Sequence, residues 1–392
     1  MISVSAAIEQ LVASAKITDG IESLSVTQSL GRVLAEDITA IIDVPPADNS
    51  AMDGYAFCYA DALKNNFILS LSQRIPAGVA PQALTPSTIA RIFTGAEIPS
   101  GADTVAMQEN CTEQNGAVAI GGSVTAAANI RLKGQDIQSG ETILRAGTKL
   151  RAQEMGLLSS IGVKTLRVFK PLKIAIFSTG DELVEPGEAL QRGQIYNSNR
   201  ATLAGLIESL GMSPIDLGTV PDSLEATESV LKKAAVQGDI ILSAGGVSVG
   251  DEDYVKSAVA KLGSIDFWRV AIKPGKPLAF GQVDNTPFIG LPGNPASVFV
   301  TFMILARPFL LASQGLCRVL PRPLKAIAQF DKPGEKREVY LRAKLIESGV
   351  QIYPNQSSGV LSSACWGELF VVQQRGQSIE AGDLVDVLPY TL

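Results

Sequence analysis

Apolar and polar positions alternate along the middle of the chain in the manner of strands followed by helices. Between about residues 172 and 311, short runs of consecutive apolar residues are each followed by a longer amphipathic segment. The expected strands are 173–178, 214–219, 239–243 and 288–291, and the expected helices are 199–210, 224–236, 253–262 and 295–311. This order is typical of βαβ units, so the pattern predicts an α/β domain with a doubly wound parallel sheet.

The segments on either side of this region have a different pattern of apolar and polar residues. From about residue 41 to 167, short alternating runs such as TIARIFTG are separated by Pro and Gly turns, which favours two or more small β-rich pieces. After Pro321, runs such as REVYLRAKLI follow one another without a helical segment, so we expect a C-terminal β-barrel or sandwich. The first sixteen residues predict an amphipathic helix.

Length and charge limit the class of protein. A chain of 392 residues exceeds one ordinary hydrophobic core and indicates several domains. The 33 Lys and Arg against 39 Asp and Glu give a net charge of -6, which offers no electrostatic reason to expect nucleic-acid binding. The N-terminus lacks the pattern of an export signal, and the longest apolar stretch, 296–306, is shorter than the roughly 18 residues of a membrane span. We therefore expect a cytoplasmic protein without a membrane partner.

Cysteine and histidine usage narrows the available chemistry. The four cysteines lie far apart without a CxxC pair, which argues against a zinc site or a disulfide framework. The chain has no histidine, so the usual general base and the commonest transition-metal ligand are absent. Catalysis would have to use carboxylates, Lys, Arg, hydroxyls, backbone dipoles and a hard cation such as Mg²⁺.

Three strands each run into a loop of small residues, at 173–183, 239–254 and 287–297. The carboxyl ends of parallel strands meet at one edge of a sheet, and Gly and Ser there let backbone N–H groups approach an anion. The pattern predicts binding of a large phosphorylated small molecule, although each loop alone could be a simple tight turn. The candidate binding residues are Ser178, Thr179, Gly180, Gly245, Gly246, Ser248, Pro292, Gly293, Asn294 and Pro295.

Charged side chains accompany these loops. Asp181 and Glu182 follow the first strand, and Asp222 follows the second. They either cap turns or hold Mg²⁺, which needs only one or two carboxylates beside phosphate oxygens. Basic residues at Arg269, Lys273 and Lys276 would offset the charge of a bound polyanion, or simply keep an exposed strand soluble.

Together with DVPPADNSAMDGYA (43–56), RIFTGAEIP (91–99) and WRVAIKPGKPLAFG (268–281), these loops resemble the molybdopterin molybdenumtransferase family. The family is called MoeA in bacteria and corresponds to the E domain of gephyrin. The resemblance implies a four-domain subunit, with the divisions 1–40 plus 134–166, 41–133, 167–317 and 318–392. It also implies a homodimer, whose active cleft lies between the α/β domain and the β-rich domain of the other subunit.

The implied reaction uses adenylylated molybdopterin and molybdate, requires Mg²⁺, and inserts molybdenum with release of AMP. The resemblance also implies the molybdopterin adenylyltransferase as a partner. Asp53 and Glu182 would hold Mg²⁺, and Arg342 with Ser358 would serve molybdate binding or turnover. The implied catalytic positions are Asp53, Thr94, Asp136, Glu182, Asp222, Asp253, Lys273, Lys276, Arg342 and Ser358. Arg269 stands where the family pattern has Lys, which replaces a point charge by a planar group.

Three alternatives stay open at this point. A molybdopterin carrier without catalysis would keep the glycine loops and tolerate loss of Asp53 and Glu182. A scaffold similar to gephyrin would need a further receptor-binding surface. A tungstate-preferring relative also stays open, because tungstate and molybdate share charge, shape and nearly the same size.

Overall fold

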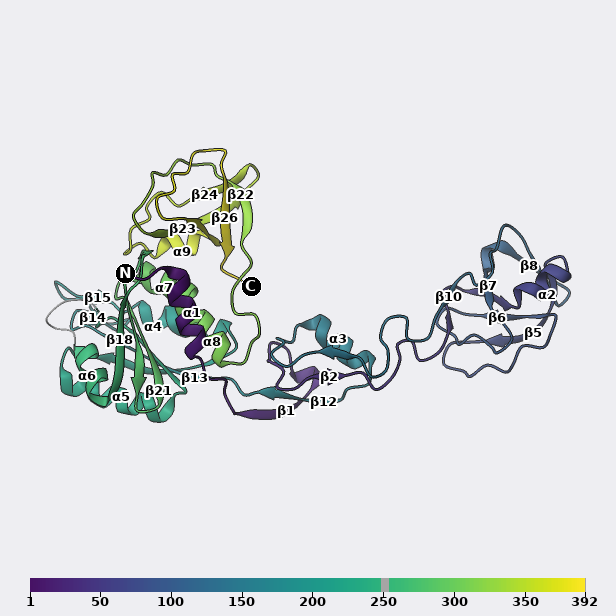
Figure 1. The fold of residues 1–392 in the computed structure, drawn as a ribbon, viewed down its shortest axis with the longest axis horizontal. Coiled ribbons are helices and arrows are strands. Elements are labelled where there is room, and N and C mark those ends of the chain that lie inside the picture. Colours follow the sequence, from purple (N-terminus) through teal and green to yellow (C-terminus); the bar gives the residue numbers. More distant parts are fainter. Residues whose placement is uncertain (248–253, 392) are drawn as a thin grey trace.

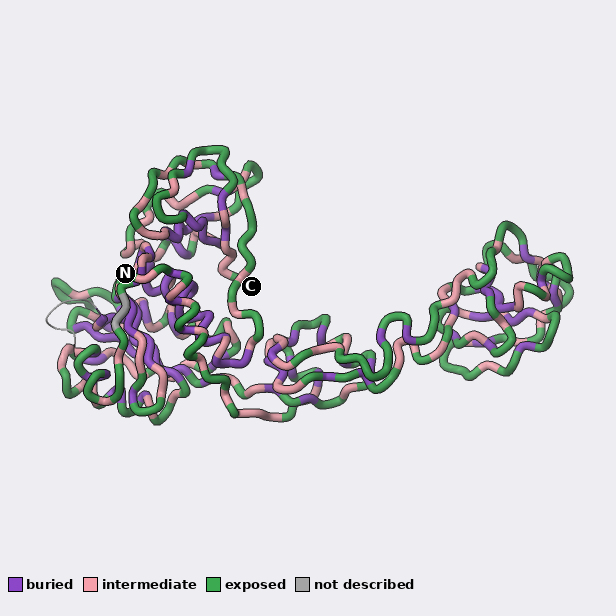
Figure 2. The backbone as a smooth tube through the Cα atoms, in the orientation of Figure 1, coloured by how far each residue is buried: buried purple, intermediate pink, exposed green. Residues whose placement is uncertain are grey.

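The computed structural model describes residues 1–247 and 254–391, without the side chains of residues 267 and 268. The chain is elongated (Figure 1): the α/β domain carries the C-terminal domain at one end, a linker follows, and a small β-rich domain forms the other end. Buried residues gather separately in each of these regions (Figure 2), so each has its own hydrophobic core.

The α/β domain is built on a six-stranded sheet. Its order is β16 (Ser213–Val220), β13 (Lys173–Thr179), β17 (Ile240–Ala244), β21 (Thr286–Leu291), β20 (Pro277–Val283) and β18 (Gly263–Arg269). The first four strands are parallel and confirm the predicted βαβ series. The last two are antiparallel, so they extend the predicted parallel sheet into a mixed one. Antiparallel neighbours need no helical crossover, so β20 and β18 lack the strand-then-helix pattern that predicts the parallel strands.

Helices cover both faces of this sheet, which confirms the doubly wound arrangement. One face packs on α4 (Asn199–Ser209) and on a long helix made of α7 (Pro295–Thr301), the π-helical η3 (Phe302–Ala306) and α8 (Arg307–Ser313). The N-terminal α1 (Val4–Ser14) packs against η3 and α8 of this long helix. The other face packs on α5 (Leu224–Gln237) and α6 (Tyr254–Leu262). The packing of α1 is with the α/β core, although the resemblance implies that residues 1–40 divide with the linker.

The long helix, Pro295–Ser313, is long and apolar enough to cross a membrane by composition alone. However, 89% of its most apolar window is buried inside the protein. It therefore acts as the central core helix of the α/β domain.

The N-terminal half forms the predicted β-rich pieces. The linker contains β1 (Ile21–Ser25) paired with β12 (Thr165–Phe169), beside η1 (Val26–Gln28) and α3 (Ala152–Ser160). Two short pairs connect it to the distal domain, β2 (Ile38–Thr39) with β11 (Thr142–Leu144) and β3 (Asn49–Ser50) with β10 (Ile130–Arg131).

The distal domain has a six-stranded sheet of its own. Its order is β7 (Thr104–Met107), β4 (Gly54–Phe57), β6 (Thr88–Ile92), β5 (Ile68–Ile75), β9 (Ala117–Ile120) and β8 (Cys111–Gln114), with α2 (Tyr59–Lys64) and η2 (Gln108–Asn110).

The C-terminal domain is a curled sheet. Its strands are β22 (Leu324–Ile327), β23 (Glu338–Ile346), β24 (Gly349–Ile352), β25 (Leu369–Gln373) and β26 (Leu384–Pro389), with the short α9 (Ser362–Trp366). A bridge between Ala328 and Val350 brings the β22 end against β24, so the sheet closes towards a barrel. The two-residue strand β19 (Ile272–Lys273) pairs with β23 and joins this domain to the α/β domain.

Candidate functional site

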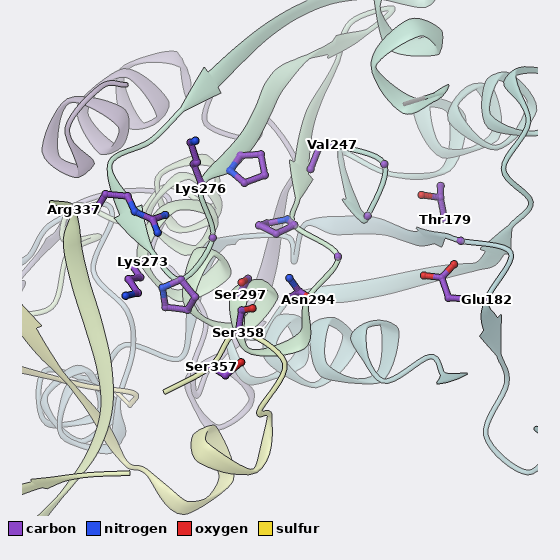
Figure 3. A pocket seen from close by; sticks show the side chains of 18 of the residues that line it. Thr179, Glu182, Val247, Lys273, Lys276, Asn294, Ser297, Arg337, Ser357 and Ser358 are labelled. Atoms are coloured by element: carbon purple, nitrogen blue, oxygen red, sulfur yellow. The ribbon is translucent and has the colours of Figure 1, made fainter. Parts of the chain in front are cut away.

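A cavity of about 740 Å³ opens at the carboxyl ends of β13, β17 and β21, against the C-terminal domain. All three predicted loops contribute to its lining (Figure 3). The loop residues in the lining are Thr179, Gly180, Gly245, Gly246, Pro292, Gly293 and Asn294. Ligands of open α/β sheets bind at this edge, so the structure brings these predicted residues to one place.

Two of the glycines are required by close backbone packing. Gly245 and Gly246 both have positive φ, +97° and +67°. A Cβ on Gly245 would lie 2.9 Å from the Thr179 carbonyl, and one on Gly246 would lie 2.3 Å from Cγ2 of Val255. A side chain at either position would push the second loop away from the first, so the wall of the cavity needs glycine here.

Two predicted binding residues stand behind the lining. Ser178 is fully buried and hydrogen-bonds to the Asn197 side chain at 3.5 Å. Pro295 is the first residue of α7. The nearby Asn199 donates its side-chain N–H to the Gly293 carbonyl at 2.7 Å, which anchors the LPGNP loop. These residues shape the cavity from outside, and Ser248 and Asp253 lie outside the described residues.

The acidic end of the cavity contains Glu182 and Asp222. The Glu182 carboxylate lies over Gly180, where an added Cβ would be 2.6 Å from Oε2. Asp181 and Asp222 exchange hydrogen bonds, since each backbone N–H donates to the other carboxylate, at 3.2 and 3.0 Å. Asp222 thus combines a turn role with a place in the lining.

The basic end is formed by Lys273, Lys276 and Arg337, which Figure 3 shows opposite Glu182. Lys273 pairs with Glu335 at 2.7 Å, and Nη1 of Arg337 donates to the Ile272 carbonyl at 2.9 Å. The hydrogen bond from Lys273 lowers the pKa of Glu335, and burial opposes this shift. We did not predict Arg337 from the sequence.

Arg269 is exposed, and it is not one of the described residues that line the cavity.

Gln356, Ser357 and Ser358 of the C-terminal domain form another wall. Arg342 holds this wall from behind, because its Nη2 donates to the Ser357 carbonyl at 3.2 Å and its Nε donates to Ser363. The residue is fully buried, and burial lowers its pKa. Ser358 is in the lining, as predicted, whereas Arg342 contacts the wall and not the open cavity.

Asp53, Thr94 and Asp136 are absent from the lining as it is described. Asp53 accepts hydrogen bonds from the backbone N–H and the hydroxyl of Thr94, at 2.7 and 2.8 Å. These bonds, the backbone one first, lower the pKa of Asp53. Both residues belong to the distal domain, at the opposite end of the chain from the cavity (Figure 1). Asp136 lies between them and the cavity, where its amide donates to Val44.

The donor groups of the cavity decide which metal ion it could hold. No three acidic, cysteine or histidine side chains converge on a metal position in the part of the chain that the structure describes. Mg²⁺ commonly uses one or two carboxylates and completes its shell with phosphate oxygens and water. Glu182 and Asp222 provide such oxygens in the cavity, so the donor set suits Mg²⁺ carried together with a phosphorylated substrate.

Known proteins match this chain over nearly all of its length. Three family models match it: the MoeA N-terminal region (domain I and II) over residues 2–162, a probable molybdopterin binding domain over 175–312, and the MoeA C-terminal region (domain IV) over 325–390. A molybdopterin molybdenumtransferase of Haemophilus influenzae is 39% identical over 383 residues, 94% of either chain.

A relative of the same name from Nostoc is 40% identical over 80% of this chain and 75% of its own. The solved molybdopterin biosynthesis MoeA protein of Pyrococcus horikoshii superimposes over the whole of both chains, with a TM-score of 0.82 and 31% identity. The resemblance noted in the sequence is therefore confirmed. The chain belongs to the molybdopterin molybdenumtransferase (MoeA) family, whose members are enzymes of molybdenum cofactor biosynthesis.

Proposed function

We propose that this enzyme inserts molybdate into adenylylated molybdopterin, with Mg²⁺ and with release of AMP. The observation that carries the proposal is one cavity with glycine loops along its floor, carboxylates at one end and cations at the other. A pterin phosphate can accept hydrogen bonds from the backbone of the glycine loops, and a second oxyanion can bind the cations. Two anions held close together need such compensation of charge.

The basic end is the proposed molybdate site. Lys273, Lys276 and Arg337 come from two domains and converge on the cavity, and Ser358 adds a hydroxyl donor. Arg337 takes the part that we had predicted for Arg342, because Arg337 lines the cavity while Arg342 is buried behind its wall. A planar guanidinium and two ammonium groups suit a tetrahedral dianion.

The acidic end is the proposed Mg²⁺ site. Glu182 and Asp222 would hold the ion, which when bound neutralises charge on the phosphoanhydride and its leaving group. Glu182 would hold the ion from its position over the first loop, since its carboxylate lies close to Gly180. The family resemblance suggests Asp53 as a further ligand, and it would have to come from a second copy of the chain.

A homodimer with a shared cleft supplies that second copy. Asp53 and Thr94 form a preorganised pair on the distal domain, and the elongated shape leaves this domain free to reach another subunit. We also propose that the molybdopterin adenylyltransferase supplies the substrate. A cytoplasmic site of action fits the four free thiols.

The test follows AMP release and cofactor formation by purified protein given adenylylated molybdopterin, Mg²⁺ and molybdate. Glu182→Gln should abolish molybdate-dependent AMP release while leaving pterin binding largely intact, and the exposed Glu188→Gln is the matched control. Unchanged turnover in Glu182→Gln would refute the role assigned to Glu182, whereas pterin binding without AMP release by the wild-type protein would leave a carrier. The same assay with tungstate in place of molybdate shows which oxyanion gives the faster AMP release.

The shared cleft is tested by mixing subunits in the same assay. Asp53→Asn and Glu182→Gln protein should each be inactive. Equal mixtures, after subunit exchange, should recover about a quarter of wild-type activity, because half of the dimers then contain one intact cleft. No recovery in mixtures shown to contain heterodimers would contradict a cleft that combines the two residues across subunits.

A further inference from the structure

A second cavity, of about 430 Å³, lies between α4, the long helix Pro295–Ser313 and the C-terminal segment. It shares no residue with the first cavity in the described part of the chain. Leu206, Phe299, Phe302 and Met303 give it apolar walls. It is large enough for a small organic ligand.

Arg307 is the unusual member of this lining. The residue is only 3% exposed, and its Nε has no hydrogen-bond partner among the described residues. Its one polar contact in that set is a long one, from Nη1 to the Tyr390 carbonyl at 3.5 Å. No described carboxylate pairs with it, and burial lowers its pKa. A buried cation without an anion destabilises a fold, so a missing counter-charge is the natural explanation.

The backbone beside Arg307 is also distorted. The π-helical segment Phe302–Ala306 interrupts the long helix immediately before it. Such segments are rare and often mark functional sites. Here the segment contributes Phe302 and Met303 to the same wall as the guanidinium, so two independent features converge on one cavity.

The charge of the cavity indicates the class of its ligand. Lys149 is a second cation in the lining, and no Asp or Glu is among the described lining residues. Neither Lys149 nor Arg307 forms a salt bridge within the described chain. Apolar walls with a desolvated guanidinium favour an anion that carries an apolar body over a bare inorganic anion.

We propose that this cavity binds an amphipathic monocarboxylate, with its chain against the aromatic walls and its carboxylate on Arg307. The site is separate from the proposed transferase reaction.

Octanoate and 1-octanol are suitable probes, because they share a chain and differ in the charged group. Isothermal titration calorimetry of the full-length protein should show octanoate binding roughly tenfold or more tightly than octanol. Arg307→Met should remove this preference and should raise the unfolding midpoint of the ligand-free protein, since a buried unpaired charge is lost. Arg307→Lys should retain part of the preference. The exposed Arg318→Met is the matched control and should bind like the wild type.

Equal affinity for octanoate and octanol in the wild-type protein would overturn the proposal, as would an octanoate affinity that Arg307→Met leaves unchanged. Absence of octanoate binding at millimolar concentration would overturn it as well. The probe comparison needs no variant, so the proposal stays testable if Arg307→Met does not fold.

Discussion

Glu335 is paired with Lys273 at the basic end of the cavity, so an anion bound there would compete with this carboxylate. Its carboxylate pairs with Lys273 at 2.7 Å, and Lys332 and Arg337 also lower its pKa through their charges. Replacing it by Gln keeps the shape and removes the negative charge. We therefore expect Glu335→Gln to bind molybdate more tightly than the wild type does.

The magnitude follows from the exposure of the pair. The Lys273 and Glu335 side chains are 40% and 29% exposed, so solvent screens the interaction substantially. A pair of this kind contributes about 0.5–1 kcal/mol, and transferring that attraction to the ligand corresponds to roughly two- to fivefold tighter binding. The gain should shrink at high ionic strength, where screening is stronger.

Calorimetric titration with molybdate at low and high salt measures the effect, with the exposed Glu347→Gln as the control. An unchanged or weaker affinity in Glu335→Gln would refute the reasoning that Lys273 is shared between the carboxylate and the anion.

The contribution of this ion pair to the stability of the folded protein depends on pH with a definite sign. Because the pKa of Glu335 is lowered from its ordinary 4.5, the pair stabilises the folded protein above that pH, and this contribution is lost as pH falls through the lower folded value.

Two further predictions concern the packing of β21 behind the first cavity and the Asp53–Thr94 hydrogen bond of the distal domain. Gly290→Ala should destabilise the protein by about 1–3 kcal/mol in urea unfolding, because the new Cβ would lie 2.3 Å from Cγ1 of Val247. Gly205→Ala in α4 is the control: its Cβ would meet nothing within 4 Å, so the substitution should be neutral or slightly stabilising. Thr94→Val should raise the pKa of Asp53 towards its ordinary value in a ¹³C NMR titration, since the hydroxyl donor is lost, and a fall would contradict the assigned hydrogen bond.

The middle of the fold was predictable because its signals are local. Each parallel strand is a short apolar run followed by an amphipathic helix, and the small-residue loops must gather where the strands end. The antiparallel pair β18 and β20 has no such signature, because its identity depends on pairing with β21. The separation of Asp53, beside β4 of the distal domain, from Glu182, after β13 of the α/β domain, likewise depends on how the domains follow one another, which no local pattern encodes.

The basic end shows why residue type alone was insufficient for the site. Residues 339–343 of β23 are all buried, so this strand lacks the alternation that separates an inward from an outward arginine. The pairing of β19 with β23 sets Ile272 opposite Glu338, and this register carries Arg337 to the Ile272 carbonyl, beside Lys273. Arg342, further along the same strand, is thereby left behind the wall with Ser357. The hydrogen bond from Arg337 to Ile272 joins residues 65 positions apart in the chain. The proposed molybdate site therefore depends on how the C-terminal domain pairs with the α/β domain, and the sequence of β23 alone does not reveal it.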